Sequence, residues 1–188
     1  MVQGLYIFDT AIGPCGLAWS EHGLTGAALP EPTAEATLVR LKRRRPHAEV
    51  RDPPAFILQA AGRIRALTRG EAVDLSDIPL DQDGCSELER QVWNITHAIP
   101  FGQTLTYGDI ARRLGDVSLS RAVGQALGAN PIPIIVPCHR VVAADGKTGG
   151  FSAPGGVSTK LKLRNIERAA TSREPLLFGD LPLEVRRG

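Results

Sequence analysis

The chain is poor in cysteine and lacks paired metal-ligand motifs. Its 188 residues include three cysteines, Cys15, Cys85 and Cys138, an odd number of widely separated thiols. Such a set does not form a disulfide framework and fits a reducing compartment, so at least one thiol is free. No CxxC or HxxxH pair occurs, and Cys15 with His22 is too sparse a ligand set for zinc. No metal and no other cofactor is therefore expected.

Long apolar runs and a strong charge imbalance are also absent. No segment is long or apolar enough to span a membrane, and the N-terminus MVQGLYIFDTAIG lacks the basic stretch and apolar core of a secretory signal. A cytoplasmic protein is therefore expected. The net charge of +2 permits contact with a polyanion such as nucleic acid but does not require it.

The first part of the chain predicts a small α/β unit. From Leu5 to about Ala28, short apolar runs separated by glycine and proline are typical of an antiparallel meander. Thr33 is a candidate N-cap for a first helix, and Pro53-Pro54 opens a second.

The acidic stretch 71–84 shows no helical period and indicates a linker. We therefore expect an N-terminal α/β structural domain over residues 1–80 and a mainly helical domain over residues 81–188. The second domain starts with a capping box, in which the side chains of Ser86 and Glu89 each accept a hydrogen bond from the backbone amide of the other at the start of a helix.

Two short helices follow, joined by a tight turn. Thr106 and Asp109 form a second capping box, and Ser120 is a candidate N-cap for a helix that stops at Asn130, before a proline. This spacing predicts a helix-turn-helix. Beyond it, Asp145-Gly146 is a hairpin signal that predicts a small wing, and a last helix is expected over about 156–168.

The second of the two short helices carries small side chains. Ala122, Gly124 and Ala129 cannot reach far into a wide groove, but they allow close approach of the backbone, which suits the minor groove. Arg121 is the one long basic side chain at its start, placed to enter a base stack or contact a phosphate. Tight packing between helices is an equally good explanation of the small residues.

The segment VPCHRVV places a thiol beside an imidazole. A free cysteine has a pKa of about 8.5, so attack by Cys138 at neutral pH requires a base. Adjacent side chains do not normally face each other, so His139 would act through a bridging water, with Glu167 on the last helix as the orienting carboxylate. A structural cysteine and a hydrogen-bonded histidine remain the alternative.

The motifs PCHRVV, SRAVGQALGANP, YGDIARRLG, FGQTLTYGDIA and GGFSAPGG occur together in residues 86–168. In this order they resemble the O6-alkylguanine-DNA alkyltransferases, the methylated-DNA-protein cysteine methyltransferases. The resemblance implies a ribonuclease H-like N-terminal domain and a winged-helix-like C-terminal domain. It implies that an O6-alkylguanine, with O4-alkylthymine as a second candidate, is flipped out of double-stranded DNA and loses its alkyl group irreversibly to the protein.

The same resemblance assigns roles to individual residues. Cys138 would be the nucleophile, His139 its water-mediated base and Glu167 the residue that orients His139. Asn130 would bind the turn and the cysteine segment. Tyr107 would lie near the flipped base or its phosphate and help neutralise the leaving guanine.

On the DNA side, Arg121 would fill the space that the flipped base leaves. The base pocket would include the main-chain carbonyl of Val141 and the region of Ser152. Phe151 stands where many relatives have tyrosine, so a hydroxyl is missing from the pocket wall. The protein is expected to act as a monomer.

Two other functions fit some of these features. A DNA lesion-binding module without chemistry would use the same helix-turn-helix, although the presence of Cys138 argues against it. A Cys-His hydrolase would use the thiol, histidine and carboxylate, but it would have no need of the helix-turn-helix.

Overall fold

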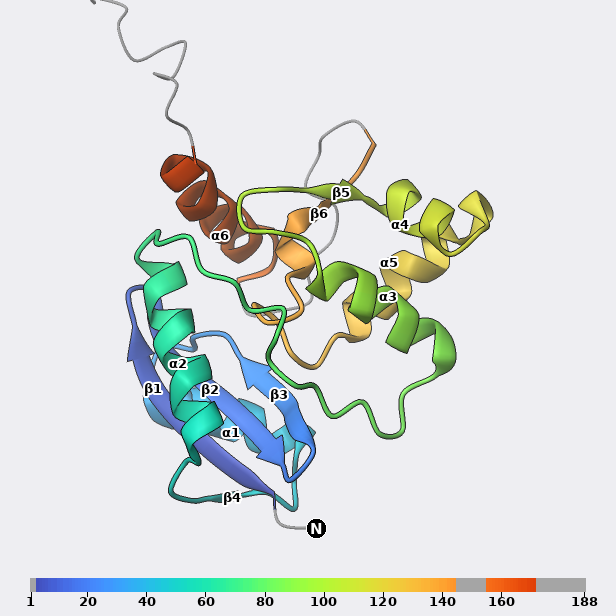
Figure 1. The fold of residues 1–188 in the computed structure, drawn as a ribbon. Coiled ribbons are helices and arrows are strands. Elements are labelled where there is room, and N and C mark those ends of the chain that lie inside the picture. Colours follow the sequence, from blue (N-terminus) through green and yellow to red (C-terminus); the bar gives the residue numbers. More distant parts are fainter. Residues whose placement is uncertain (1–2, 145–154, 172–188) are drawn as a thin grey trace, which may run out of the picture.

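The computed structural model describes residues 3–144 and 155–171 (Figure 1). The predicted meander is confirmed, with β1 (Gly4–Thr10), β2 (Gly13–Ser20) and β3 (Gly23–Ala28) pairing antiparallel in sequence order. A short strand that the sequence did not predict, β4 (Glu49–Val50), pairs parallel with β1 and completes the sheet order β3-β2-β1-β4.

Two helices cover opposite faces of this sheet (Figure 1), α1 (Ala34–Arg44) and α2 (Ala55–Thr68). The alternation of side chains along β1 explains the arrangement, since Leu5 belongs to the cluster with α1 and Phe8 to the cluster with α2. The predicted cap of α1 is confirmed, because the Thr33 hydroxyl accepts a hydrogen bond from the Ala36 amide at 3.1 Å.

The C-terminal part is helical, as predicted. It contains α3 (Glu87–His97), α4 (Tyr107–Arg113), α5 (Ser120–Ala129) and α6 (Gly156–Thr171). Both predicted capping boxes are present, at Ser86 with Glu89 and at Thr106 with Asp109. Among the helices described, none combines the length and apolar composition needed to cross a membrane.

The predicted cap of α5 is wrong. Ser120 is the first residue of α5 rather than its N-cap, and its hydroxyl donates to the Val117 carbonyl at 2.8 Å. The chain starts winding earlier, in the 3₁₀ turn η1 (Val117–Leu119), so Asp116 becomes the residue with extended backbone and caps the Ser118 amide at 2.8 Å. α4 and α5 are therefore joined by an ordered turn.

A second, two-stranded sheet lies next to these helices. β5 (Leu105–Thr106), just before α4, pairs parallel with β6 (Val141–Val142), just after the CHR segment. The pairing holds the start of α4 against the end of that segment. The predicted wing at Asp145-Gly146 lies outside the described residues.

The two parts of the chain share one large hydrophobic cluster, and backbone hydrogen bonds cross between them. The connecting segment runs beside β3, where Leu24 donates to the Pro79 carbonyl at 2.9 Å and accepts from the Asp81 amide at 2.9 Å. Ala27 in β3 donates to the Pro131 carbonyl at 2.8 Å. The N-terminal sheet thus supports the segment that follows α5.

The C-terminal end of α5 is completed by side chains from other elements. The last carbonyls of a helix have no partner within the helix. The indole of Trp93 on α3 donates to the Ala126 carbonyl at 2.9 Å, and Arg44 at the end of α1 donates to the Asn130 carbonyl at 3.3 Å. Side chains from both the N-terminal and the C-terminal part of the chain therefore fix where α5 ends.

Substitution of Trp93 by Phe should destabilise the protein by about 1–3 kcal/mol, because it leaves the buried Ala126 carbonyl without a donor. Urea unfolding followed by circular dichroism measures this difference. An unchanged midpoint and slope would show that the Trp93 hydrogen bond does not contribute to stability.

Candidate active site

Cys138 lies in the 3₁₀ turn η2 (Cys138–Arg140), which ends at β6. Its amide donates to the Val136 carbonyl at 2.8 Å, and the Arg140 amide donates to the Pro137 carbonyl at 2.8 Å. The Cys138 side chain is 8% exposed, and it forms part of the wall of a cavity of about 1170 Å³. The thiol is therefore buried by the protein and still faces a space large enough for a nucleobase.

The loop before Cys138 is held from within by Asn130. The Asn130 amide group donates to the Val136 carbonyl at 2.9 Å, and its side-chain oxygen accepts from the Ile132 amide at 2.9 Å. Ile134 in this loop has φ of +74°, a left-handed conformation that costs a β-branched residue on the order of 1–3 kcal/mol. Asn130 and the packing around the loop keep it in this strained form.

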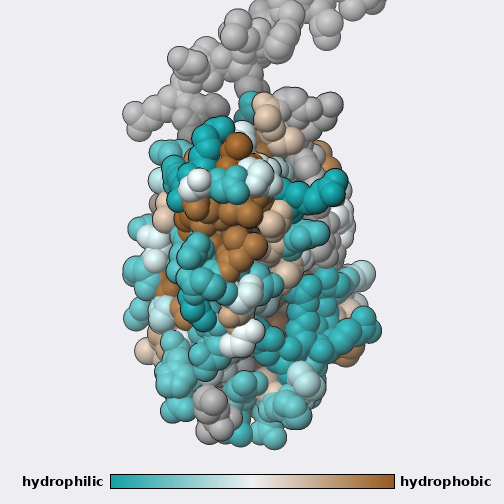
Figure 2. Space-filling model, turned by 90° about the vertical axis from the view of Figure 1, so that its right-hand side faces the viewer, coloured by the Kyte–Doolittle hydropathy of each residue, from teal (hydrophilic) through white to brown (hydrophobic). Residues whose placement is uncertain are grey.

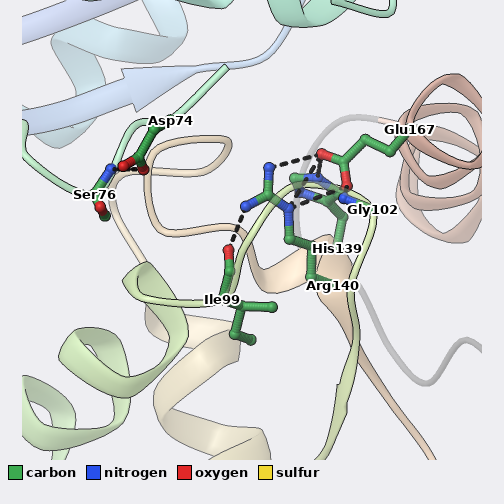
Figure 3. A network of polar contacts seen from close by, with 7 residues as sticks. All are labelled: Asp74, Ser76, Ile99, Gly102, His139, Arg140 and Glu167. Atoms are coloured by element: carbon green, nitrogen blue, oxygen red, sulfur yellow. Dashed lines mark hydrogen bonds and ion pairs between the residues drawn. The ribbon is translucent and has the colours of Figure 1, made fainter. Parts of the chain in front are cut away.

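The imidazole of His139 and the guanidinium of Arg140 converge on one carboxylate from α6 (Figure 3). The Nε2 atom of His139 lies 2.8 Å from Oε1 of Glu167, and Arg140 donates to Glu167 through Nε at 3.2 and 3.1 Å and through a terminal nitrogen at 2.9 Å. The Gly102 amide donates to Oε2 at 3.3 Å, and Arg140 also donates to the Ile99 carbonyl. All three side chains are buried.

Glu167 is ionised and His139 is neutral at pH 7. Burial raises the pKa of Glu167, but hydrogen bonds and charges from His139 and Arg140 outweigh it and bring the pKa to about 2. Burial lowers the pKa of His139 below its ordinary value, and this outweighs the opposing effect of Glu167. The neutral ring then carries its proton on Nε2, where it donates to Glu167.

The other ring nitrogen is available as a base. Within the described part of the chain, Nδ1 of His139 has no hydrogen-bond partner. With Nε2 donating to Glu167, Nδ1 holds a lone pair and accepts a proton. No hydrogen bond joins the side chains of Cys138 and His139 in the described residues, so proton transfer between them needs a bridging water.

Several groups oppose the effect of burial on the thiol. Burial raises the pKa of Cys138, while the side chain of Asn130 and the charge of Lys160 lower it by smaller amounts. Burial also lowers the pKa of Lys160 to about 8, although Cys138 raises it, so most of this ammonium stays charged at pH 7. The thiol is therefore mainly protonated in the resting protein, with a cation close enough to stabilise the thiolate when it forms.

Tyr107 stands at the start of α4, in the wall of the same cavity. The Nζ atom of Lys160 lies 5.8 Å from the centre of its ring. Burial and the nearby Cys138 raise the pKa of the Tyr107 hydroxyl, so it is a proton donor at neutral pH. The structure thus brings Tyr107 close to Cys138, although the two come from different helical segments.

Part of α5 forms one wall of the cavity. Arg121, Gly124 and Gly128 line it, whereas Ala122 is half-buried and Ala129 is exposed. A Cβ at Gly128 would meet nothing within 4 Å, and one at Gly124 would make ordinary contact with Tyr107 at 3.9 Å. Packing inside the protein therefore does not require glycine at these positions. Figure 2 shows the side of the molecule on which α4 and α5 lie in Figure 1, where apolar surface gathers and is bordered by hydrophilic side chains.

The sequence predicted three residues of the base pocket. Val141 is buried in β6, next to η2, and Ser152 and Phe151 lie outside the described residues. Sequence reasoning missed Arg140 and Lys160, which are both buried at the site. The position of Arg140 within the apolar segment VPCHRVV could have predicted a buried arginine that needs a carboxylate partner.

A metal centre has no support among the residues that the structure describes. No group of three or more His, Cys, Asp or Glu side chains there is arranged to hold an ion. Cys15 is buried, with its sulfur 3.7 Å from the Thr10 hydroxyl, and Cys85 is half-buried.

Substitution of Lys160 by Met should raise the pKa of the Cys138 thiol further, because it removes the cation that lowers this pKa. Reaction of Cys138 with iodoacetamide at pH 7, where most of the Lys160 ammonium is charged, should then be several-fold slower than in the wild type. Lys162→Met, on the exposed side of the same helix, is the matched control and should leave the rate unchanged. Equal rates in both variants would contradict the role given to Lys160.

Comparison with known proteins identifies relatives that match most of the chain. The family profile described as 6-O-methylguanine DNA methyltransferase, DNA binding domain, matches residues 87–169. The methylated-DNA–protein-cysteine methyltransferase of Mycobacterium tuberculosis is 38% identical over 170 residues, which cover 90% of this chain and 95% of the relative. The protein of the same name from Methanosarcina acetivorans is 37% identical over 165 residues, 86% of this chain and 96% of that one.

Solved structures of O6-methylguanine methyltransferases have a fold similar to that of this chain. The crystal structure of Mycobacterium tuberculosis OGT in complex with DNA matches with a TM-score of 0.73 and 36% identity, covering 89% of this chain and 94% of that one. The O6-methylguanine-DNA methyltransferase of Pyrococcus kodakaraensis matches with a TM-score of 0.63 and 26% identity, covering 88% of this chain and 99% of that one. From the identity and coverage of its relatives, the chain belongs to the methylated-DNA–protein-cysteine methyltransferase family.

Proposed function

We propose that the protein repairs alkylated DNA by transferring the alkyl group from O6-alkylguanine to Cys138 in a single turnover. The observation that carries this proposal is the position of Cys138 in the wall of a base-sized cavity, with a neutral His139 and the ionised Glu167 behind it. The names and DNA complex of the relatives support the same reaction. O4-alkylthymine is a second candidate substrate.

The reaction is a single displacement at the alkyl carbon. The proton of the Cys138 thiol passes through a water to Nδ1 of His139, and Glu167 stabilises the imidazolium that forms. The thiolate attacks as the bond between carbon and O6 breaks, so a thioether forms and the electron pair leaves with guanine. Tyr107 donates a hydrogen bond to the departing base. Among the described residues, no group at the site can cleave the thioether, so the protein acts once.

The environment explains why the thiol can stay protonated until substrate arrives. Burial disfavours the thiolate, and Lys160 offsets part of this effect. Asn130 and the turn η2 fix the direction of Sγ by holding the backbone on both sides of the loop. Because attack requires the sulfur, alkyl carbon and oxygen to be in line, a rigid thiol contributes directly to the rate.

The DNA would lie across the open side of the cavity. Arg121 and the small residues Ala122, Gly124 and Ala129 on α5 form a face that can approach the minor groove closely. The exposed Arg121 would occupy the space of the flipped base. The Val141 carbonyl, Ser152 and Phe151 belong to the proposed base pocket.

The proposal also covers the fold of each domain, the oligomeric state and the location of the protein. The N-terminal sheet unit would be ribonuclease H-like and structural, over residues 1–80, and residues 81–188 would form a winged-helix-like domain for DNA binding and alkyl transfer. Thr106 and Asp116, which cap α4 and η1, support the helix-turn-helix within it. A monomer acting in the cytoplasm without a cofactor fits this reading.

The mass of the intact protein after incubation with duplex DNA containing one O6-methylguanine tests this function. We expect one added methyl group at one equivalent, found by peptide mapping on the Cys138 peptide. Cys15, whose pKa burial raises to about 11, is an internal control and should stay unmodified. Cys138→Ser should gain no mass. An unchanged wild-type mass with DNA still bound would indicate a recognition module without chemistry.

Substitution of Glu167 by Gln should slow alkyl transfer about a hundredfold or more, since general acid–base catalysis typically contributes 10²–10⁴-fold. The imidazolium of His139 would lose its counter-charge, while the hydrogen-bonding shape of the side chain is kept. In the wild type the rate should stay level between pH 7 and 6.5, because the pKa of His139 lies below its ordinary value and Lys160, with a pKa of about 8, is mainly charged in this range. Single-turnover rates measure both effects.

Glu87→Gln, at an exposed carboxylate on α3, is the control for this substitution and should transfer at the wild-type rate. Circular dichroism of each variant verifies that the fold is kept. A wild-type rate in folded Glu167→Gln would eliminate the proposed role of His139 as the base.

A further inference from the structure

Val117 is an apolar side chain that the fold leaves exposed beside the cavity of Cys138. It is 57% exposed and is one of six exposed large apolar side chains in the described residues. The other five are Val39, Val50, Leu58, Val157 and Leu161. Among these six, Val117 alone lines the cavity that contains Cys138, Tyr107 and Arg121. Val117 is therefore an exposed apolar side chain that lies directly beside the candidate active site.

Val117 continues the face of α5 that borders the cavity. Val117, Arg121, Gly124 and Gly128 follow one another at helical spacings of four, three and four residues, and all four line the cavity. The first two positions have large side chains and the last two have none. The face thus projects side chains at its beginning and is flat farther along.

Local hydrogen bonds keep Val117 in this exposed position. Asp116 caps the turn through the Ser118 amide at 2.8 Å, and its carbonyl accepts from the Leu119 amide at 3.1 Å. The Ser120 hydroxyl donates to the carbonyl of Val117 itself at 2.8 Å. These hydrogen bonds fix the backbone of the turn, and the apolar side chain of Val117 points away from it into solvent.

We propose that Val117 is an apolar wedge that packs against deoxyribose and the edges of unstacked bases in the minor groove, next to the position that Arg121 enters. This inference rests on the proposed function. Apolar side chains inserted at base steps unstack them and favour bent duplexes. Val117 would then separate two stacked base pairs, and Arg121 would occupy the space that the flipped base leaves.

A polar substitution tests the wedge against a matched control. Val117→Ser removes the apolar surface, and Val39→Ser makes the same change at a residue that is 58% exposed on α1, away from the cavity. The measurement is the single-turnover rate with O6-methylguanine in duplex DNA, divided by the rate with O6-methylguanine as the free base. We expect Val117→Ser to lower this ratio about tenfold, Val117→Leu to restore it, and Val39→Ser to leave it unchanged.

Two results would overturn the wedge. They are an unchanged ratio in Val117→Ser, whether or not both rates fall together, and an equal effect of Val39→Ser. If Val117 instead covers a second copy of the chain, light scattering would show a dimer that Val117→Ser disrupts, with the ratio unchanged. Failure of the proposed function gives a different result, because the wild-type protein would then take no alkyl group from either substrate.

Discussion

The buried carboxylate of Glu167 is the constraint on which the rest of the site depends. A charge removed from water is tolerated only with close partners, and removal of one partner typically costs about 3–5 kcal/mol. Glu167 finds these partners in His139, Arg140 and the Gly102 amide, so α6, the turn η2 and the loop before β5 meet at one point. The same interaction leaves Nδ1 of His139 as the free base.

The second constraint is the end of α5. Trp93 from α3 and Arg44 from α1 satisfy its last carbonyls, and β3 binds the Pro131 carbonyl just beyond. From this fixed point Asn130 shapes the strained loop that carries Cys138. The N-terminal sheet, which has no residue in the cavity wall, therefore contributes to the geometry of the thiol through the backbone.

The sequence predicted features that depend on local interactions. The antiparallel meander, the caps at Thr33, Ser86 and Thr106, and the stop of α5 at Asn130 follow from patterns within a few residues. The prediction of an N-cap at Ser120 was wrong, because a 3₁₀ turn that begins at Val117 precedes α5. Contacts between distant segments, such as β4 with β1 and Arg140 with Glu167, have no local signature.

The protonation state of His139 in the resting protein tests the central claim most directly. Nitrogen-15 NMR of the labelled imidazole distinguishes the neutral tautomers from the imidazolium, and the spectrum of His139→Gln assigns the signals. We predict a neutral ring at pH 7 with the proton on Nε2 and a bare Nδ1. An imidazolium, or a neutral ring protonated on Nδ1, would contradict the account, because Nδ1 could not then accept the proton of Cys138.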